Sequence, residues 1–361
     1  MLRLIPGLQR FRAHVILAED GPIVGRLEDA GISTEVLPLD PKALNVSRDR
    51  VGRSLGVRQV GASLAYAHRL HQRLRTLRPS IVHANSLKSG YYGVVAARSA
   101  GVPMVWHLRD RLAADYMPEL ACRMTRSVIR YGASGVIANS RVTLATLGPR
   151  RAGQPREVVY DPYRPIHPPR QPSGDRSGFT VGLVGRISPW KGQDVFLRAV
   201  AELRRTMPDL SARIIGDALF DETGYAESLH RLTTELGLDD VVEWRGFRSD
   251  VESELSELDA LVHSSTIPEP FGMVVVEGMA AGLPVIATAI GGPTEVIRDG
   301  EDGLLVAAND PGAIARAVTR LRTGDLAARL GGAAQRSAER FAPEIAGAEV
   351  EALYDRILQR G

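Results

Sequence analysis

A short apolar run, a polar loop, a short helical stretch and a second apolar run follow one another between residues 259 and 288. The first run, 259–263, has the length of a buried parallel strand, and a Gly and a Pro would end the helix before the second run. Two carboxylates lie between the runs, Glu269 in the loop and Glu277 on the helix. Ligands of open α/β sheets bind at the carboxyl ends of strands, so we expect both carboxylates at a ligand site.

The start of this helix favours a particular kind of ligand. Its first backbone N–H groups have no partner within the helix and attract negative charge or oxygen atoms. These groups belong to Phe271, Gly272, Met273 and Val274. The two carboxylates accept hydrogen bonds from sugar or ribose hydroxyl groups. The stretch therefore suits a ligand that carries both hydroxyl groups and anionic charge.

The same alternation of strand and helix extends over the whole chain. In the first half we expect strands at 14–18, 34–38, 81–84, 103–107 and 135–138, with helices at 57–78, 90–100 and 118–131. In the second half we expect strands near 179–185, 212–216, 241–245, 259–263, 284–288 and 304–306, with helices near 191–206, 225–236, 249–257 and 311–323, and closing helical stretches at 325–340 and 344–359. Repeated strand–helix–strand units predict an α/β fold with doubly wound parallel sheets.

Length and proline content predict two domains. A chain of 361 residues exceeds the usual size of one domain. Residues 161–178 hold five prolines, a density that no regular element tolerates. We therefore predict an N-terminal domain at 1–160, a linker at 161–178 and a C-terminal domain at 179–343.

Charge also divides the chain. Residues 1–160 carry 24 Lys and Arg against 11 Asp and Glu, whereas the remainder is acidic. The basic half could face anionic lipid, an acidic acceptor or nucleic acid, or its arginines could simply cover solvated helix faces. No apolar run approaches the roughly 20 residues that span a bilayer, and the N-terminus lacks the pattern of a secretory signal. With a single cysteine and so no internal disulfide, the chain fits a cytoplasmic location.

Two cations follow the first strand of the second half. Arg186 comes directly after Gly185, and Lys191 precedes Gly192 at the start of a helix. Arg can clamp a diphosphate through two N–H groups and Lys adds a point charge, although two solvated cations in a loop would look the same. The dinucleotide fingerprint G-x-G-x-x-G is missing at the strand–helix junctions, which argues against an NAD enzyme.

His107 ends a strand of the first half. A histidine at this edge can donate to a sugar hydroxyl or to developing charge, or it can serve packing alone. Sequence leaves both interpretations open.

Together these features resemble the family 4 retaining glycosyltransferases (glycosyl transferases group 1), which have the GT-B fold. The most specific match is Glu269-Pro-Phe-Gly-Met-Val-Val-Val-Glu277 followed by Gly-Met-Ala-Ala-Gly-Leu-Pro-Val. Gly-Arg186-x4-Lys191-Gly is the second match, and the run 291–306 is the third. The resemblance covers nearly the whole chain from about residue 13.

The resemblance implies a role for each candidate residue. Arg186 and Lys191 would neutralise the donor diphosphate, and Glu277 would bind the ribose hydroxyls. Glu269, with the N–H groups near Phe271, Gly272 and Met273, would hold the donor sugar, and His107 would approach its anomeric carbon. The loop 245–248, which contains Phe247, would contact the nucleobase. We expect catalysis by positioning and charge stabilisation, with no metal and no cofactor beyond the nucleotide sugar.

The resemblance also implies the partners and one departure. The donor would be a nucleotide-diphosphate hexose, and the acceptor hydroxyl could belong to a cell-surface glycan, a glycolipid at the membrane or a secondary metabolite; we expect no nucleic-acid partner. The helix at 344–361 would pack back on the first domain. Relatives open with a strand and a Gly-rich loop, whereas Met1–Gly7 looks like the end of the following helix. Either the start is misassigned or the protein lacks these elements.

Two alternative functions fit the same fold. One is an epimerase of nucleotide sugars or an enzyme similar to glycogen phosphorylase. The other is a catalytically impaired protein that binds sugar nucleotides.

Overall fold

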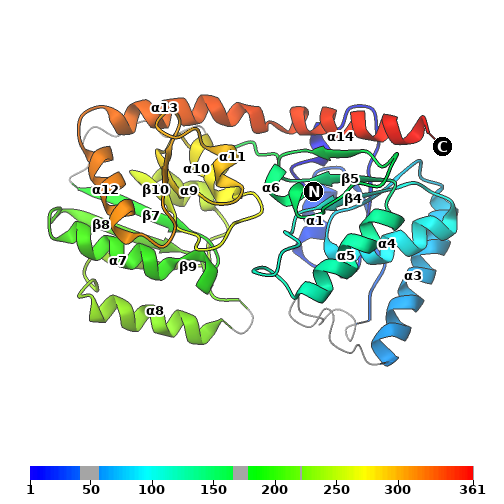
Figure 1. Ribbon diagram of the computed structural model, residues 1–361, viewed down its shortest axis with the longest axis horizontal. Coiled ribbons are helices and arrows are strands. Elements are labelled where there is room, and N and C mark those ends of the chain that lie inside the picture. Colours follow the sequence, from blue (N-terminus) through cyan, green and yellow to red (C-terminus); the bar gives the residue numbers. More distant parts are fainter. Residues whose placement is uncertain (41–56, 166–177, 220–221, 361) are drawn as a thin grey trace. The chain divides into compact units, whose positions relative to one another are not determined.

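The computed structural model describes residues 1–40, 57–165, 178–219 and 222–360, which form two compact units (Figure 1). The first unit consists of Met1–Pro162 with Pro343–Gly361, and the second of Tyr163–Ala342. Residues 41–56 and the centre of the predicted linker lie outside the described residues. The fold class is confirmed, because both units are built on parallel sheets.

The first unit contains two parallel sheets. β1 (His14–Leu17) pairs with β2 (Ser33–Val36). The larger sheet has the order β3-β4-β5-β6. Its strands are β3 (Val82–Ala84), β4 (Met104–Leu108), β5 (Gly135–Ala138) and β6 (Arg156–Val158). Strand β6 did not emerge from the sequence, because a three-residue edge strand with two charged side chains shows no apolar run.

Helices cover both faces of the larger sheet (Figure 1). The helices of this unit are α1 (Pro22–Asp29), α3 (Val57–Leu77), α4 (Leu87–Ala100), α5 (Glu119–Gly132), α6 (Arg141–Ala145) and α14 (Pro343–Leu358), with a 3-10 turn η1 (Ile5–Gly7). The prediction placed the start of α4 too late. Ser86 accepts a hydrogen bond from the Ser89 N–H at 3.2 Å and Ser89 Oγ accepts one from the Ser86 N–H at 2.9 Å, a capping box that begins the helix at Leu87.

Successive side chains of β4 point to opposite faces of the sheet and so enter two different hydrophobic cores. Trp106 and Leu108 face one core, which also includes buried residues of α4 and α5. Val105 faces the other core, where α14 contributes Val350 and Tyr354. Near that core, Glu351 accepts hydrogen bonds from the backbone N–H groups of residues 9, 10 and 11 at 2.6–3.1 Å. The C-terminal helix therefore belongs to the fold of the first unit.

The second unit holds a six-stranded parallel sheet in the order β12-β11-β10-β7-β8-β9. The strands are β7 (Phe179–Val184), β8 (Leu210–Ile215), β9 (Val242–Gly246), β10 (Ala260–His263), β11 (Val285–Thr288) and β12 (Leu304–Val306). The helices are α7 (Gln193–Arg204), α8 (Thr223–Glu235), α9 (Val251–Ser256), α10 (Met273–Ala280), α11 (Pro293–Val296), α12 (Pro311–Arg322) and α13 (Leu326–Ala338), with 3-10 turns η3 (Pro189–Lys191) and η4 (Glu339–Phe341).

The strand order creates a topological switch point between β7 and β10. The chain continues from β7 to β8 on one side, and β10 lies on the other side of β7. The loops after two such strands leave in opposite directions, and the crevice between them is the usual ligand site of this architecture. Among the described residues, no helix is both long and apolar enough to cross a membrane.

Candidate active site

The loops after β7 and β10 form the candidate site. Ala260 of β10 pairs with Val181 of β7, so the carboxyl ends of both strands reach the same sheet edge. Arg186 and Lys191 follow β7, and Glu269 follows β10. The structure thus brings together three of the residues that the sequence selected.

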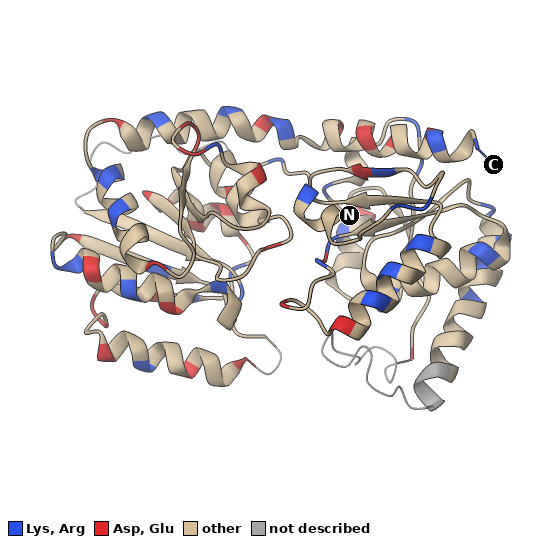
Figure 2. Cartoon of the chain, viewed as in Figure 1, with Lys and Arg blue, Asp and Glu red and all other residues tan. Residues whose placement is uncertain are grey.

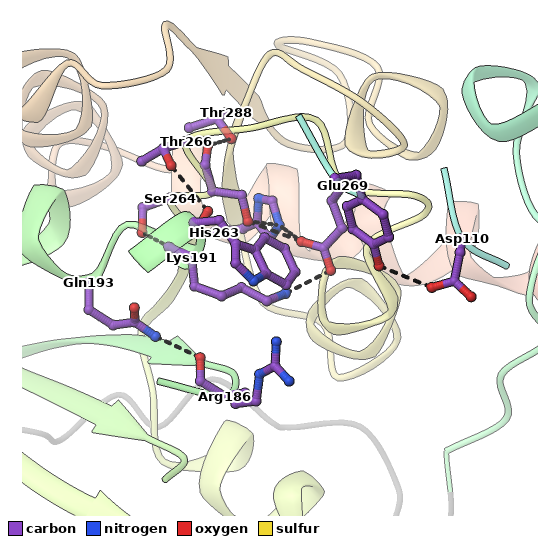
Figure 3. A network of polar contacts seen from close by, with 12 residues as sticks. Asp110, Arg186, Lys191, Gln193, His263, Ser264, Thr266, Glu269 and Thr288 are labelled. Carbon is purple, nitrogen blue, oxygen red and sulfur yellow. Dashed lines mark hydrogen bonds and ion pairs between the residues drawn. The ribbon is translucent and has the colours of Figure 1, made fainter. Parts of the chain in front are cut away.

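A buried ion pair joins the two loops (Figure 3). Lys191 Nζ lies 2.7 Å from Glu269 Oε1, and both side chains are largely buried. The other carboxylate oxygen lies 2.6 Å from His263 Nε2 and accepts a hydrogen bond from Ser265 Oγ at 3.1 Å. Glu269 is therefore held by three side chains before any ligand is considered.

These contacts set the protonation of Glu269. Burial on its own would raise the pKa of the carboxyl group. The positive charge of Lys191 and the contact with His263 outweigh burial and hold the pKa of Glu269 well below its usual range. Glu269 is consequently an anion that can accept hydrogen bonds from hydroxyl groups.

Hydrogen bonds fix the backbone around the ion pair. Ser264 Oγ donates to the carbonyls of Lys191 and Gly192 at 3.0 and 2.9 Å. The Thr266 N–H donates to the Trp190 carbonyl at 2.9 Å. On the β7 side, Gln193 Nε2 donates to the Arg186 carbonyl at 2.9 Å (Figure 3). The loops are thus bound to each other through main chain as well as through the ion pair.

Close packing explains why glycine follows Lys191. Gly192 has a φ of +68°, which L-residues rarely adopt, and a Cβ there would lie 2.1 Å from the Ser264 carbonyl oxygen. Any side chain at this position would push the two loops apart.

Two further glycines, Gly291 and Gly292, support the Glu269 loop from the other side. Gly292 donates its N–H to the Glu269 carbonyl at 2.8 Å. A Cβ on Gly291 would lie 2.5 Å from the backbone of Glu269, and one on Gly292 would lie 2.3 Å from Phe271 Cα. The run at 291–293 therefore works as a backbone support, a function that the sequence did not reveal.

Helix α10 presents its first turn to this edge. Gly272 occupies the N-cap position with a φ of +96°. The Phe271 ring is buried and packs against Phe341 at a centroid distance of 5.8 Å, so the ring itself does not face a ligand. Met273, Val274 and Glu277 are half-buried. Glu277 lies on the helix, one turn beyond Met273, as predicted.

Arg186 and Phe247 make other contacts than the Lys191–Glu269 ion pair. Arg186 Nε is 3.4 Å from Glu222 Oε2, which places a carboxylate beside the predicted diphosphate contact. Phe247 follows β9, two strands away from β7, and its side chain is 73% exposed. Phe247 has no part in the hydrogen bonds described above around Lys191 and Glu269, and its ring is open to solvent.

His107 lies in the first unit, at the carboxyl end of β4. It is 1% exposed, and its Nδ1 lies 3.0 Å from His83 Nε2. Burial, and then the charge of Arg109, hold the pKa of His107 well below its ordinary value, so the ring is neutral. Close by in the same sheet edge, Arg109 pairs with Asp161, which also accepts a hydrogen bond from Asn139 at 3.1 Å.

Sequence reasoning missed several participants. The apolar run 259–263 predicts a buried strand and gives His263 no role, although His263 is the last residue of β10 and so reaches the ligand edge. Gly192 ends the Gly-Arg186-x4-Lys191-Gly match, but sequence gave it no role of its own, and it gave none to Ser265 in the loop after the strand. His83 and its contacts gave no signal, because its partners are distant in sequence.

Comparison with known proteins agrees with this architecture. The family description "Glycosyl transferases group 1" matches residues 170–337, and "Glycosyl transferase 4-like domain" matches residues 1–164. The chain belongs to this family of glycosyltransferases, which have the GT-B fold. It is 33% identical over 322 residues to a D-inositol 3-phosphate glycosyltransferase of Streptomyces scabiei, covering 80% of this chain and 71% of the relative. The corresponding enzyme of Streptomyces coelicolor is 31% identical over 338 residues, with 82% and 73% covered.

Solved structures show the same fold. Anabaena HepE in complex with UDP and glucose is similar with a TM-score of 0.83 and 29% identity, covering 97% of this chain and 94% of HepE. A sucrose-phosphate synthase from Thermosynechococcus elongatus has a TM-score of 0.73 at 20% identity, a likeness of fold alone, with 98% and 97% covered.

Proposed function

We propose that this glycosyltransferase moves a hexose from a UDP-sugar to an acceptor hydroxyl with retention of anomeric configuration. The observation that carries the proposal is the Lys191–Glu269 pair, which places a cation and an ionised carboxylate together at the switch point. A nucleotide sugar requires both, because its diphosphate is anionic and its hexose donates hydroxyl groups. The similarity to HepE bound to UDP and glucose supports the choice of donor.

The cations act on the leaving group. The bond between the anomeric carbon and the diphosphate oxygen breaks, and the acceptor oxygen bonds to the same face of that carbon. The acceptor proton passes to an oxygen of the departing UDP. Arg186 and Lys191 stabilise the charge that develops on the diphosphate, which is an electrostatic contribution rather than covalent catalysis.

The acidic and aromatic residues hold the donor. Glu269 accepts hydrogen bonds from the hexose together with the first N–H groups of α10, and Glu277 accepts them from the ribose. Phe247 supports the uracil ring through stacking. Strands lie about 4.8 Å apart, so β9 is about 10 Å from β7, comparable to the span of a nucleoside diphosphate. His107 donates toward the hexose, and the reaction proceeds without metal.

Direct product analysis tests this proposal. Purified protein is offered UDP-glucose and other UDP-hexoses with cell extract, and products are followed by mass spectrometry in EDTA. We expect transfer that Arg186→Ala and Glu277→Ala each reduce by at least 100-fold, whereas Glu227→Ala on the exposed side of α8 leaves it unchanged. Wild-type turnover in both site variants would overturn the site assignment. Binding of UDP without any transfer would favour a binding protein instead.

We further propose that the acceptor is reached at an anionic membrane surface through α5. Leu120, Met124 and Tyr131 are 54, 49 and 58% exposed. At about 100° per residue these three positions fall within roughly 40° of one another on the helix. Exposed Arg123 lies beside them. Figure 2 shows basic residues along α5 and an acidic residue only near its start.

Vesicle sedimentation tests the membrane proposal. We expect binding to vesicles with anionic lipid that weakens between low and moderate salt, and little binding to neutral vesicles. Met124→Glu should abolish it. Leu219→Glu, which changes an equally exposed leucine of the second unit, should not. Salt-independent binding, or none, contradicts the proposal.

A further inference from the structure

We infer that Glu254 is a positioning residue for Phe247. It binds the arginines on both sides of Phe247 and so fixes the exposed ring on which the nucleobase of the donor stacks. The stacking rests on the proposed function, whereas the contacts of Glu254 do not. All of these residues belong to the second unit.

One buried carboxylate binds both sides of the loop 245–248. Arg245 Nε donates to Glu254 Oε2 and Arg245 Nη2 donates to Glu254 Oε1, each at 3.0 Å. Arg248 Nε lies 3.1 Å from Glu254 Oε1. The pair with Arg245 is the two-pronged contact of guanidinium and carboxylate, a geometry that restricts both side chains. Phe247 thus lies between two residues bound to the same side chain, and we call these contacts the Glu254 clamp.

Glu254 is itself held in place. The residue is 6% exposed, so its charge would be costly without the two arginines. It lies on α9, which begins directly after the loop. Asp250 Oδ1 accepts a hydrogen bond from the Ser253 N–H at 3.0 Å and caps this helix. Leu255 is fully buried and anchors the helix, so the loop is bound to a fixed point.

Main-chain contacts fix the same loop from the side of the sheet. The N–H of Gly216, which follows β8, donates to the Gly246 carbonyl at 2.9 Å. A Cβ on Gly216 would lie 2.0 Å from the carbonyl oxygen of Gly185, which follows β7. The start of the loop is therefore held by backbone contacts relative to the turn that carries Arg186.

The clamp holds a ring that is open to solvent. Phe247 is 73% exposed, more than any other large apolar side chain that the structure describes. A single exposed apolar side chain is common at protein surfaces and by itself indicates nothing. A ring on a fixed backbone is different, because little conformational freedom remains to be lost when a flat ligand stacks on it. The clamp therefore favours binding at the face of the ring.

Glu254→Gln breaks the clamp with the smallest change of shape. The amide has one acceptor oxygen in place of two and sets an NH2 group against a guanidinium, so it cannot hold both arginines. Arg248→Met removes only the exposed side of the clamp and leaves the buried pair of Arg245 and Glu254 intact. Asp209→Asn is the matched control, because Asp209, just before β8, accepts two hydrogen bonds from Arg322 at 2.5 and 2.6 Å.

Fluorine NMR of full-length protein labelled with 4-fluorophenylalanine measures the clamp without ligand. Fluorine at the para position lies on the axis of ring flips, so its relaxation is insensitive to them. Phe247→Leu identifies the signal. We expect the transverse relaxation rate at Phe247 to fall by about half in Glu254→Gln, because the loop gains nanosecond motion, and to fall in Arg248→Met as well. It should stay unchanged in Asp209→Asn. An unchanged rate in either clamp variant overturns the inference.

Calorimetry with two ligands tests the consequence for the nucleobase. UDP carries a base that can stack on Phe247, whereas inorganic pyrophosphate has none. We expect Glu254→Gln to weaken UDP binding about tenfold and pyrophosphate binding by less than about twofold. In the Phe247→Ala background the same change should have no further effect on UDP, because Glu254 acts through the ring. Equal losses for both ligands, or additive losses of UDP affinity in the double variant, overturn the inference.

Neither measurement needs turnover. A coupled loss of UDP affinity in a protein that transfers no hexose would disprove the proposed function alone. If the wild type binds no UDP, the choice of donor fails, and the fluorine relaxation still decides whether Glu254 holds Phe247.

Discussion

Lys191 Nζ lies 2.7 Å from Glu269 Oε1 and links the loops that follow two adjacent strands, β7 and β10. The cation proposed for the diphosphate is therefore already neutralised by the carboxylate proposed for the sugar. Donor binding must share Lys191 between Glu269 and a phosphate oxygen. Binding of the diphosphate by Lys191 and binding of the hexose by Glu269 are consequently coupled through this one ion pair.

A double-mutant cycle should reveal this coupling. Lys191→Met leaves a buried carboxylate with only His263 and Ser265, so we expect a loss of about 3 kcal/mol in the stability of the second unit. Glu269→Gln should restore part of it in the double variant, with a coupling energy of about 1–3 kcal/mol from urea denaturation. Additive losses would show that the two side chains do not interact.

Gly292 should not tolerate even a methyl group. Its Cβ would lie 2.3 Å from Phe271 Cα, so we expect Gly292→Ala to displace the Glu269 loop and to destabilise the unit by about 1–3 kcal/mol. Gly224→Ala is the control, because a Cβ there meets nothing within 4 Å and the residue lies in α8. That change should be neutral or stabilise slightly. Equal thermal shifts in both variants would contradict the close packing.

Phe247 should contribute to binding and not to folding. Its ring is 73% exposed, so Phe247→Ala should change unfolding by less than about 0.5 kcal/mol. Loss of stacking should weaken UDP binding by about 1–3 kcal/mol, measured by calorimetry. An unchanged dissociation constant would remove Phe247 from the donor site.

Stability should fall as the solution becomes acidic. Burial first, and the charge of Arg109 second, lower the folded pKa of His83 from the ordinary value of 6.5 to about 3, so the unfolded chain binds the proton first. The stability that neutral His83 provides is fully present above pH 6.5 and is lost as the pH falls from there toward 3. By pH 5 the loss reaches about 2 kcal/mol for this one group.

Urea midpoints at pH 7.5, 6.5, 5.5 and 5.0 measure this loss. His83→Gln should reduce the slope by about 1.4 kcal/mol per pH unit below pH 6. The pKa values of Glu269 and Glu351 are lowered in the folded protein, so the stability that these carboxylates provide is lost only in more acidic solution than this series covers. A slope that the His83 variant leaves unchanged would argue against a buried neutral histidine.

Local patterns predicted the architecture and part of the site. Apolar runs bounded by Gly and Pro correctly placed Glu269 in a loop and Glu277 on a helix, because strand ends and helix ends are encoded by neighbouring residues. His263 was missed because a histidine that ends an apolar run looks like part of the core. The contact between His83 and Tyr354 depends on how α14 packs on β3 and β4, which no local pattern records.

The return of α14 to the first unit has a consequence for synthesis. Residues Tyr163–Ala342 form a complete compact unit inserted between the two segments of the other. During translation the whole of the second unit therefore emerges from the ribosome before the last segment of the first unit does. Until residue 354 has left the exit tunnel, His83 has no phenol beside it and residues 9–11 have no carboxylate. The half of the protein that is translated first is the half that matures last.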